Sequence, residues 1–277
     1  MESGGTGFGS DYSMELGDAD AERLALLGRF YDPNSAGFLE SAGVSAGDSV
    51  VDLGCGHGAF TDRIATRVGE AGAVYAVDTS ADQLCVARSA LANCSNVTFV
   101  EGAVEDNPLQ GKQVDWVYSR FLLMHVRDAR RALLAMADML NDNGALLLEI
   151  ADIGSLQFRP AEPSSDLWRP WWYALGRSRG ASFDIAERVV DLLDQTGFSV
   201  ERRDRYQPVS TSREAKRVHA LGFEQCAPAY LDELGVPADQ VEAHRAFLYR
   251  AVDDPRIAVA LFENTQYIAR PREPRSN

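Results

Sequence analysis

The sequence has few positive charges and no long apolar run. Its 277 residues contain 27 lysines and arginines against 41 aspartates and glutamates, which gives a formal net charge of −14. A protein that binds nucleic acid needs a positive face to displace counterions from phosphates, so this balance argues against a nucleic-acid partner. No stretch of about 18 apolar residues occurs, so we expect no membrane-spanning helix and no membrane partner.

Cysteine is scarce and scattered. The four cysteines have neither the spacing of a zinc site nor that of a disulfide-rich domain, so we predict no metal centre. They are Cys55, Cys85, Cys94 and Cys226. The start of the chain, MESGGTGFGSDYSMELGD, lacks the cationic and apolar regions of a secretory signal. We therefore expect a cytoplasmic protein, with residues 1–10 as a flexible tail.

Short apolar runs alternate with helical patterns between about residues 49 and 151. This alternation is typical of βαβ units and of a parallel sheet that is covered by helices on both faces. The predicted strands are 49–53, 73–77, 97–100, 114–118 and 145–150, followed later in the chain by 198–209 and 263–271.

Capping residues mark the ends of several predicted helices. Ser80 with Gln83, and Asp184 with Glu187, have the spacing of capping boxes, and Asp128 is a candidate N-cap. The predicted helix stops are Gly69, the run NDNG at 141–144, and Gly197. A longer helical pattern follows residue 212, with breaks expected near Pro228, Pro237 and Pro255.

These patterns divide the chain into five expected segments. They are a flexible tail at 1–10, an N-terminal helical cap at 11–44, a cofactor-binding Rossmann-like core at 45–152, an aromatic-rich lid insertion at 153–181, and a closing helix and strands at 182–277 that include a helical substrate-pocket insertion at about 212–262.

The stretch VVDLGCGHGAF, residues 50–60, predicts a strand, a tight glycine turn and a helix. Gly54, Gly56 and Ala59 satisfy the dinucleotide pattern G-x-G-x-x-A, so a nicotinamide-dependent oxidoreductase is one alternative. Asp52, however, would repel a pyrophosphate and attract an ammonium group. Asp78, 24 residues after Gly54, suits the two hydroxyls of a ribose. A ligand with a ribose, a cationic amino-acid end and no phosphate is S-adenosylmethionine.

With these residues, the sequence resembles the class I S-adenosylmethionine-dependent methyltransferases. The matching segments stand in the family's order and spacing over roughly residues 45–151. They are VVDLGCGHG (50–58), YAVDTS (75–80), FVEGAVEDNPL (99–109) and VDWVYSRFLLMHV (114–126). The resemblance implies an α/β fold with a doubly wound, seven-stranded, mostly parallel sheet and an antiparallel last strand. Residues 12–33 resemble the leading helix of the small-molecule branch, which folds over the cofactor.

The resemblance also implies a set of cofactor contacts. Asp52 would face the methionine ammonium group, Asp78 the ribose, and Thr79 the adenine. Ala103 stands where the family often has an acid, which leaves Val104 and Glu105 as candidates for the adenine contact. The full predicted set is Tyr12, Asp52, Gly54, Cys55, Gly56, Asp78, Thr79, Val104, Glu105, Ser119 and Arg120.

Several members of this set have a purely structural alternative. Arg120 could pair with the cofactor carboxylate, but it could equally pair with acids of the protein surface. Thr79 could be a helix cap, and Tyr12 an ordinary residue of the tail. Cys55, inside the glycine turn, is expected to be packed and unreactive.

His125 is the candidate general base, because imidazole changes protonation near neutral pH. A hydrogen-bonded structural histidine is the alternative. The predicted substrate pocket contains Trp168, Trp171, Trp172 and Tyr173. This aromatic cluster indicates a lid over a bulky, mostly apolar small molecule, as in natural-product tailoring. A self-burying helical cap or the interface of a homo-oligomer would produce the same pattern.

Three functions other than small-molecule methylation are compatible with parts of this evidence. A nicotinamide-dependent oxidoreductase would use the same glycines. A methyltransferase-like fold recruited as a cyclase, or as a binding partner of another enzyme, would retain the cofactor residues. A nucleic-acid methyltransferase would need a basic approach surface, which the acids diluting the runs ERRDRYQ (201–207) and SREAKR (212–217) disfavour.

Overall fold

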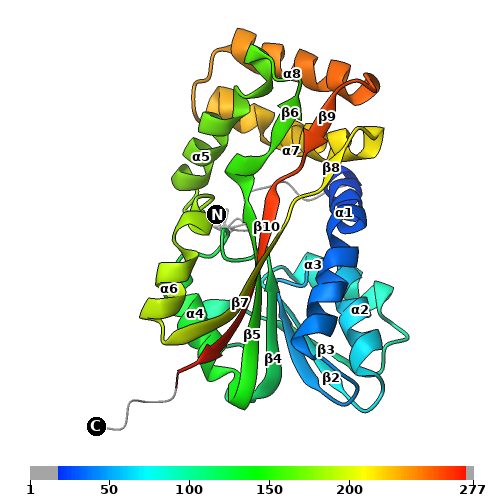
Figure 1. Cartoon of the computed structure of the whole chain (residues 1–277), viewed down its shortest axis with the longest axis vertical. Helices are drawn as coiled ribbons and strands as arrows, with labels where there is room; N and C mark the ends of the chain where they lie inside the picture. The colour runs from blue at the N-terminus through cyan, green and yellow to red at the C-terminus, as the bar shows by residue number, and fades with distance from the viewer. Residues whose placement is uncertain (1–17, 273–277) are drawn as a thin grey trace, which may run out of the picture.

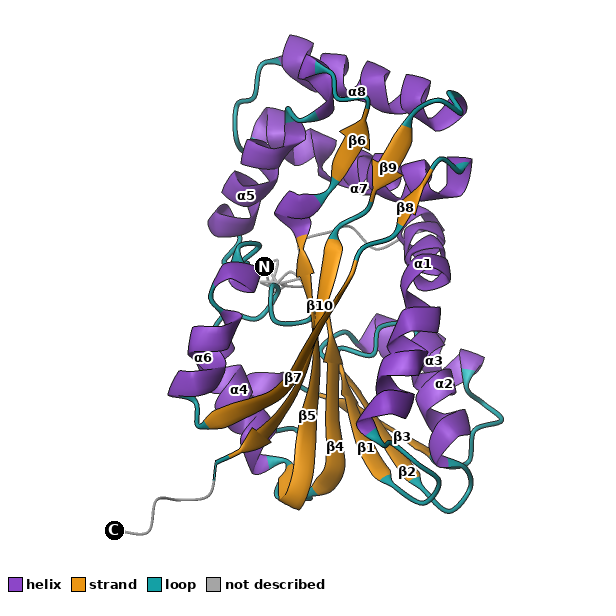
Figure 2. Cartoon of the chain, viewed as in Figure 1, coloured by secondary structure: helices purple, strands orange, loops and turns teal. Residues whose placement is uncertain are grey.

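The computed structural model describes residues 18–272 of the chain, and its lower half is one large sheet with helices on both faces (Figures 1 and 2). Hydrogen-bonded neighbours in this seven-stranded sheet follow the order β3-β2-β1-β4-β5-β10-β7. In that order the strands are Val97–Glu101, Ala73–Asp78, Ser49–Leu53, Val114–Arg120, Leu140–Asp152, Glu263–Pro271 and Phe198–Tyr206. The predicted α/β class and the seven-stranded sheet are confirmed.

The direction of the strands also agrees with the prediction. β1 runs parallel to β2 and β4, β2 to β3, and β4 to β5, whereas β10 is antiparallel to both of its neighbours. The chain order reverses between β1 and β4. In open sheets of this kind, ligands bind at the carboxyl ends of the strands beside such a switch point.

Two apolar layers hold the helices against the sheet. On one face, α1 (Asp18–Ala42) and α2 (Ala59–Val68) pack over alternate residues such as Val50. On the other face, α4 (Ala129–Asp138) and α6 (Val189–Gln195) pack over the intervening residues of the same strands, such as Val51. Successive residues of a strand point to opposite faces, so strands buried on both sides are continuously apolar. α3 (Ala81–Ala90) contacts β2 and β3.

Two of the predicted helix ends differ in the structure. The run 141–144 lies inside β5, because α4 already ends at Asp138 and a shift in register between Val114 and Trp116 accommodates the extra residues. The predicted capping box of Asp184 and Glu187 does not form.

The side chain of Asp184 instead accepts a hydrogen bond from Ser182 Oγ at 2.8 Å. A short 3-10 helix, η4 (Ile185–Glu187), therefore precedes α6. The caps at Ser80 and Asp128, and the stops at Gly69 and Gly197, lie where they were predicted.

The upper half of the molecule is helical and carries a second, small sheet that the sequence analysis did not predict. Strand β9 (Ala258–Ala260) pairs antiparallel with β6 (Gln157–Arg159) and β8 (Val209–Ser210). Strands of two or three residues are too short to show an alternating pattern. The strand predicted at 198–209 is consequently divided between β7 and β8.

Helices α5 (Trp168–Ser178), α7 (Arg213–Asp232) and α8 (Ala238–Asp253) complete this upper half (Figure 1). The break expected at Pro228 is absent, because Pro228 lies inside α7. The helix continues through the missing backbone donor since its buried side chains pack against α1 and α8. The remaining 3-10 helices are η1 (Val104–Asp106), η2 (Ile153–Ser155) and η3 (Pro163–Ser165). Within residues 18–272, no helix is both long and apolar enough to cross a membrane.

A buried carboxylate joins the sheet to α1. Glu149, on β5, is completely buried and accepts hydrogen bonds from Tyr118 Oη at 2.6 Å, Ser35 Oγ at 3.0 Å and Gln266 Nε2 at 3.0 Å. Asn264 donates a further bond. Burial raises the pKa of Tyr118 well above its usual value, so this phenol remains a donor at neutral pH.

The substitution Tyr118→Phe should therefore destabilise the protein. It leaves one oxygen of Glu149 buried without its donor, which should lower the free energy of unfolding by about 1–3 kcal/mol. Urea denaturation measures this change. Tyr75→Phe on β2, which keeps the ring that Lys112 covers, is the matched control and should change stability by less than about 0.5 kcal/mol. Equal effects of the two variants would contradict the role of Glu149.

Candidate active site

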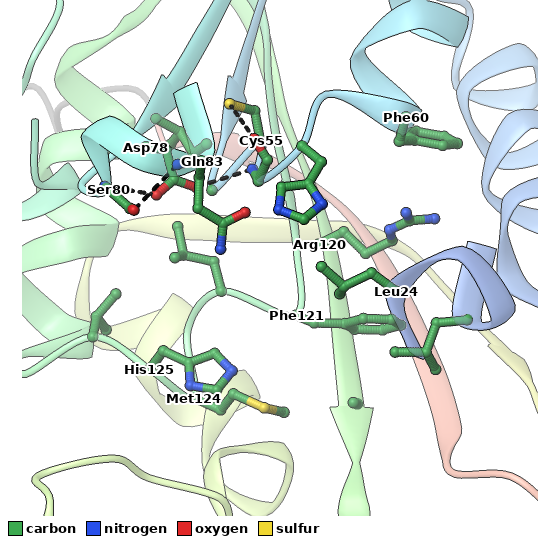
Figure 3. A pocket seen from close by; sticks show the side chains of 18 of the residues that line it. Leu24, Cys55, Phe60, Asp78, Ser80, Gln83, Arg120, Phe121, Met124 and His125 are labelled. Atoms are coloured by element: carbon green, nitrogen blue, oxygen red, sulfur yellow. Dashed lines mark hydrogen bonds between the residues drawn. The ribbon is translucent and has the colours of Figure 1, made fainter. Parts of the chain in front are cut away.

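A cavity of about 990 Å³ lies above the carboxyl ends of β1, β2 and β4. Its volume is at the upper end of the range for small-molecule sites, which leaves room for two ligands. The glycine turn and the β2 end form one wall, and residues of α1, α5 and α7 form others. Figure 3 shows part of this wall, with Gln83 on the same side as Asp78, and with Arg120 and Leu24 on the other side.

The glycine turn is fixed by backbone hydrogen bonds to the end of β2. Gly54 N and Cys55 N both donate to the carbonyl oxygen of Val77, at 2.8 and 2.9 Å. Gly54 and Gly56 have φ angles of 75° and 54°, in the left-handed region that favours glycine. A Cβ on Gly54 would also come within 3.0 Å of the Leu122 side chain. The turn therefore needs glycine for its conformation and for space.

Asp78 occupies the position predicted for the ribose contact. Its Oδ2 accepts from Gly56 N, and its Oδ1 accepts from Ser80 N, both at 2.9 Å. Each oxygen of an ionised carboxylate can accept a second bond, so the group is rigid and still able to bind two hydroxyls. Because Ser80 N is already bound to Asp78, only half of the predicted capping box forms, in which Ser80 Oγ accepts from Gln83 N.

Asp52 provides a buried negative charge at the end of β1. Only 4% of the residue is exposed, and Thr61 Oγ1 donates to its Oδ2 at 2.6 Å. Burial raises the pKa of Asp52 to about 6, while the Thr61 hydrogen bond and the charge of Arg120 oppose the rise. The carboxylate is therefore ionised at neutral pH and suited to a cationic ligand. Thr61, nine residues later on α2, was missed by the sequence analysis, and its position carried no motif.

Arg120 is held by an acid of α1 that the sequence analysis did not identify. Its Nη1 donates to Asp32 Oδ1 at 2.9 Å and to Ser35 Oγ at 3.3 Å, and its guanidinium lies 4.4 Å from the centre of the Phe60 ring. Asp32 also pairs with Arg63. Arg120 lines the cavity, so a contact with the cofactor carboxylate stays a prediction.

The remaining predicted cofactor residues divide into three groups. Thr79, Val104 and Glu105 line the cavity, and Ser80 rather than Thr79 caps α3. Ser119 is fully buried and is not among the lining residues. Tyr12 lies outside the described residues.

Cys55 also lines the cavity, at the glycine turn. Burial raises the pKa of its thiol, with the nearby charges of Asp52 and Asp78 adding to the shift. The thiol therefore stays protonated, in agreement with the expectation of an unreactive cysteine.

His125 lines the cavity, and its ring makes an edge-on contact with Phe183 at 5.8 Å between centroids. Burial, with a smaller contribution from Arg23, lowers the pKa of His125 to about 4. The imidazole is therefore neutral at physiological pH and weakly basic. Its role as general base stays a prediction.

Two of the four predicted lid aromatics line the cavity. Trp168 and Trp172 are one helical turn apart on α5 and both line it. Trp171 packs instead against Tyr230, at 5.6 Å between centroids. Tyr173 also lies outside the lining, with its hydroxyl close to Gly154.

The cofactor end of the cavity fits S-adenosylmethionine by its donor and acceptor set. Asp52 suits the ammonium group, and Asp78 the ribose. The carboxamide oxygen of Gln83, beside Gly56, is buried and has no hydrogen-bond partner among residues 18–272. A buried polar atom of this kind is costly unless a ligand satisfies it. Val104 and Leu122 provide apolar surface in the same cavity.

Comparison with known proteins identifies the same region. Residues 50–144 match a family described as a methyltransferase domain. Over 125 residues the chain is 35% identical to a 2-phytyl-1,4-naphtoquinone methyltransferase of Trichormus variabilis. The matched segment covers 44% of this chain and 55% of that protein. The chain thus spans about half the length of this relative.

Two solved structures share the fold. A SAM-dependent methyltransferase from Aquifex aeolicus has a TM-score of 0.52 at 19% identity, over 68% of this chain and 92% of that one. The [4+2]-cyclase SpnF has a TM-score of 0.54 at 17% identity, over 91% and 82% of the two chains. The methyltransferase domain and its S-adenosylmethionine cofactor, both predicted from the sequence, are confirmed.

Asp78→Asn should weaken the binding of S-adenosylhomocysteine by about 100-fold, because two charge-assisted hydrogen bonds to the ribose are lost or inverted. Calorimetric titration measures the affinity. Asp82→Asn, at an exposed position of α3, removes the same charge and should leave the affinity within about twofold. An unchanged affinity of Asp78→Asn would exclude the ribose contact.

The affinity for S-adenosylhomocysteine should also depend on pH through Asp52. Protonation removes the charge that attracts the ammonium group, and the pKa of Asp52 is about 6. The affinity should be constant above this pH and should fall by up to about tenfold per pH unit below it. The measurement is the same titration between pH 5 and 8, in which Asp52→Asn should be weak and flat. A wild-type profile without a break would contradict this assignment.

Proposed function

We propose that this chain, which carries a class I methyltransferase domain, transfers a methyl group from S-adenosylmethionine to a bulky, mostly apolar small molecule. One observation carries the proposal: the acids Asp52 and Asp78 and the indole rings of Trp168 and Trp172 line a single cavity. Cofactor and acceptor could therefore meet there. The four cysteines are free thiols, which supports a reducing cytoplasm as the location.

The reaction requires little covalent chemistry from the protein. When bound, S-adenosylmethionine supplies a methyl carbon attached to a positively charged sulfur. The acceptor's electron pair would form the new bond as the carbon–sulfur bond breaks, the sulfur would keep that bonding pair, and the methylated oxygen or ring carbon would release its proton to solvent. The protein aligns the two molecules and excludes water. Asp52 and Asp78 would fix one end, and Trp168, Trp172 and Phe262 would enclose the acceptor.

With His125 as the base, its protonation state would restrict the acceptor. A neutral imidazole whose pKa is about 4 accepts a hydrogen bond but is a poor base for a weakly acidic alcohol. This favours an electron-rich aromatic carbon or a phenolic oxygen as the nucleophile. The named activity of the Trichormus relative supports a quinone-type ring as the first acceptor to test.

A cyclase, or a cofactor-binding partner of another enzyme, is the second candidate. The shared fold of the [4+2]-cyclase SpnF motivates it, although that likeness concerns the fold alone. Both candidates retain the cofactor residues. They differ in whether the methyl group leaves the cofactor.

The test of the proposal is transfer of label from methyl-labelled S-adenosylmethionine to 1,4-dihydroxynaphthalene and related reduced quinones. Labelled product that is lost in Asp78→Asn would support methylation. Binding of S-adenosylhomocysteine without transfer to any acceptor would favour the cyclase or partner function. Binding of NAD alone would favour the oxidoreductase.

For an acceptor that is methylated, Trp172→Leu should raise the KM by about tenfold and leave the affinity for S-adenosylhomocysteine within about twofold, because the variant removes about 1.4 kcal/mol of apolar contact. Trp116→Leu is the matched control. Trp116 lies outside the cavity and donates to Asp48, so this variant should lower stability without changing the KM. Equal effects on KM would exclude the lid as the acceptor site.

A further inference from the structure

We propose that His219 accepts a hydrogen bond from a hydroxyl group of the acceptor, so that the substrate is a hydroxylated aromatic compound. This inference rests on the proposed function and specifies its substrate. It depends on two neighbouring histidines, His219 on α7 and His244 on α8, that no spacing in the sequence indicated.

The ring of His219 is part of the cavity wall and is held in place by its neighbours. His219 lines the cavity together with Trp168. The two rings are in edge-on contact at 4.6 Å between centroids, and Phe158 lies 5.8 Å from His219 on a second side. A ring that is enclosed in this way presents its nitrogens in fixed directions.

The hydrogen bonds of His244 determine which of its nitrogens carries the proton. His244 is completely buried, and its Nδ1 lies 2.7 Å from the carbonyl oxygen of Ser164. A carbonyl oxygen can only accept, so Nδ1 of His244 must be the donor. In a neutral imidazole the other nitrogen, Nε2, is then an acceptor.

This tautomer of His244 in turn determines that of His219. The two Nε2 atoms face each other at 3.4 Å. Because Nε2 of His244 is an acceptor, the proton of this contact must belong to Nε2 of His219. The remaining nitrogen of His219, Nδ1, is therefore left with a lone pair and no proton.

Both rings are neutral, as this arrangement requires. Burial lowers the pKa of His219 well below its usual value, and the neighbouring His244 and Arg169 lower it further. Burial lowers the pKa of His244 to about 4, although the Ser164 hydrogen bond and the charge of Asp166 oppose the shift. At neutral pH, the nitrogen of His219 that does not face His244, Nδ1, is therefore an acceptor only.

A fixed acceptor in this wall, which also contains the indole N–H groups of Trp168 and Trp172, discriminates between related ligands. A hydroxyl group can donate to Nδ1 of His219, whereas a carbonyl or an ether oxygen would place two lone pairs against each other. Sites built to bind a hydroxyl discriminate strongly against analogues that lack it. Trp172, Phe121 and Phe262 line the same cavity and suit the flat ring that would carry this hydroxyl.

The experiment compares three ligands of one shape on the protein saturated with S-adenosylhomocysteine. They are 1,4-dihydroxynaphthalene, its dimethyl ether and 1,4-naphthoquinone, titrated by calorimetry without oxygen. We expect the diol to bind at least about tenfold more tightly than the other two. In His219→Phe, which keeps a ring, this ratio should fall to about one. In His244→Phe, which frees His219 to take either tautomer, it should be intermediate.

A second measurement needs neither a variant nor an acceptor. Nitrogen-15 NMR of the imidazole groups in the wild-type protein distinguishes the two neutral tautomers. We expect His219 to be protonated on Nε2. Protonation on Nδ1, no binding of the diol, no preference for it, or a preference that survives in His219→Phe would each overturn the inference.

The binding of S-adenosylhomocysteine keeps the two proposals separate. If it fails, the proposed function fails, while NMR on the ligand-free protein still decides the tautomer of His219. If it succeeds and the diol is not preferred, the methyltransferase proposal stands and the hydroxyl inference is wrong.

Discussion

The carboxylate of Asp78 is the interaction on which the candidate site depends. Its two oxygens accept the backbone N–H groups of Gly56 and Ser80, so one side chain joins the glycine turn to the start of α3. The same oxygens keep free lone pairs that face a cavity. A group that is already immobilised costs little entropy when a ligand binds to it.

The charged side chains near Asp78 each have a partner that offsets the cost of their burial. Asp52 is buried beside Thr61 and close enough to Arg120 for its charge to be stabilised, although burial still raises its pKa to about 6. Arg120 is in turn paired with Asp32. The helix α1, which supplies Asp32 and lines the same cavity, thus contributes to the electrostatics around Asp52.

The residues predicted for the cofactor end could be placed together from the sequence because that end is local. Asp52, Gly54 and Gly56 follow one strand and Asp78 ends the next, so strand order alone brings them together. Other contacts of the site join residues that are distant in sequence. Asp32 meets Arg120 across 88 positions, and His219 meets His244 across 25. Such pairs depend on how α1, α7 and α8 pack, which periodicity does not specify.

A crystal structure with S-adenosylhomocysteine would test the central claim most directly, because that claim concerns where the ligand lies in the cavity. The account predicts the ribose hydroxyls on Asp78, the amino group beside Asp52, and the sulfur facing the part of the cavity lined by Trp168 and Trp172. A ligand whose ribose lies away from Asp78, or whose sulfur faces away from these two side chains, would contradict it.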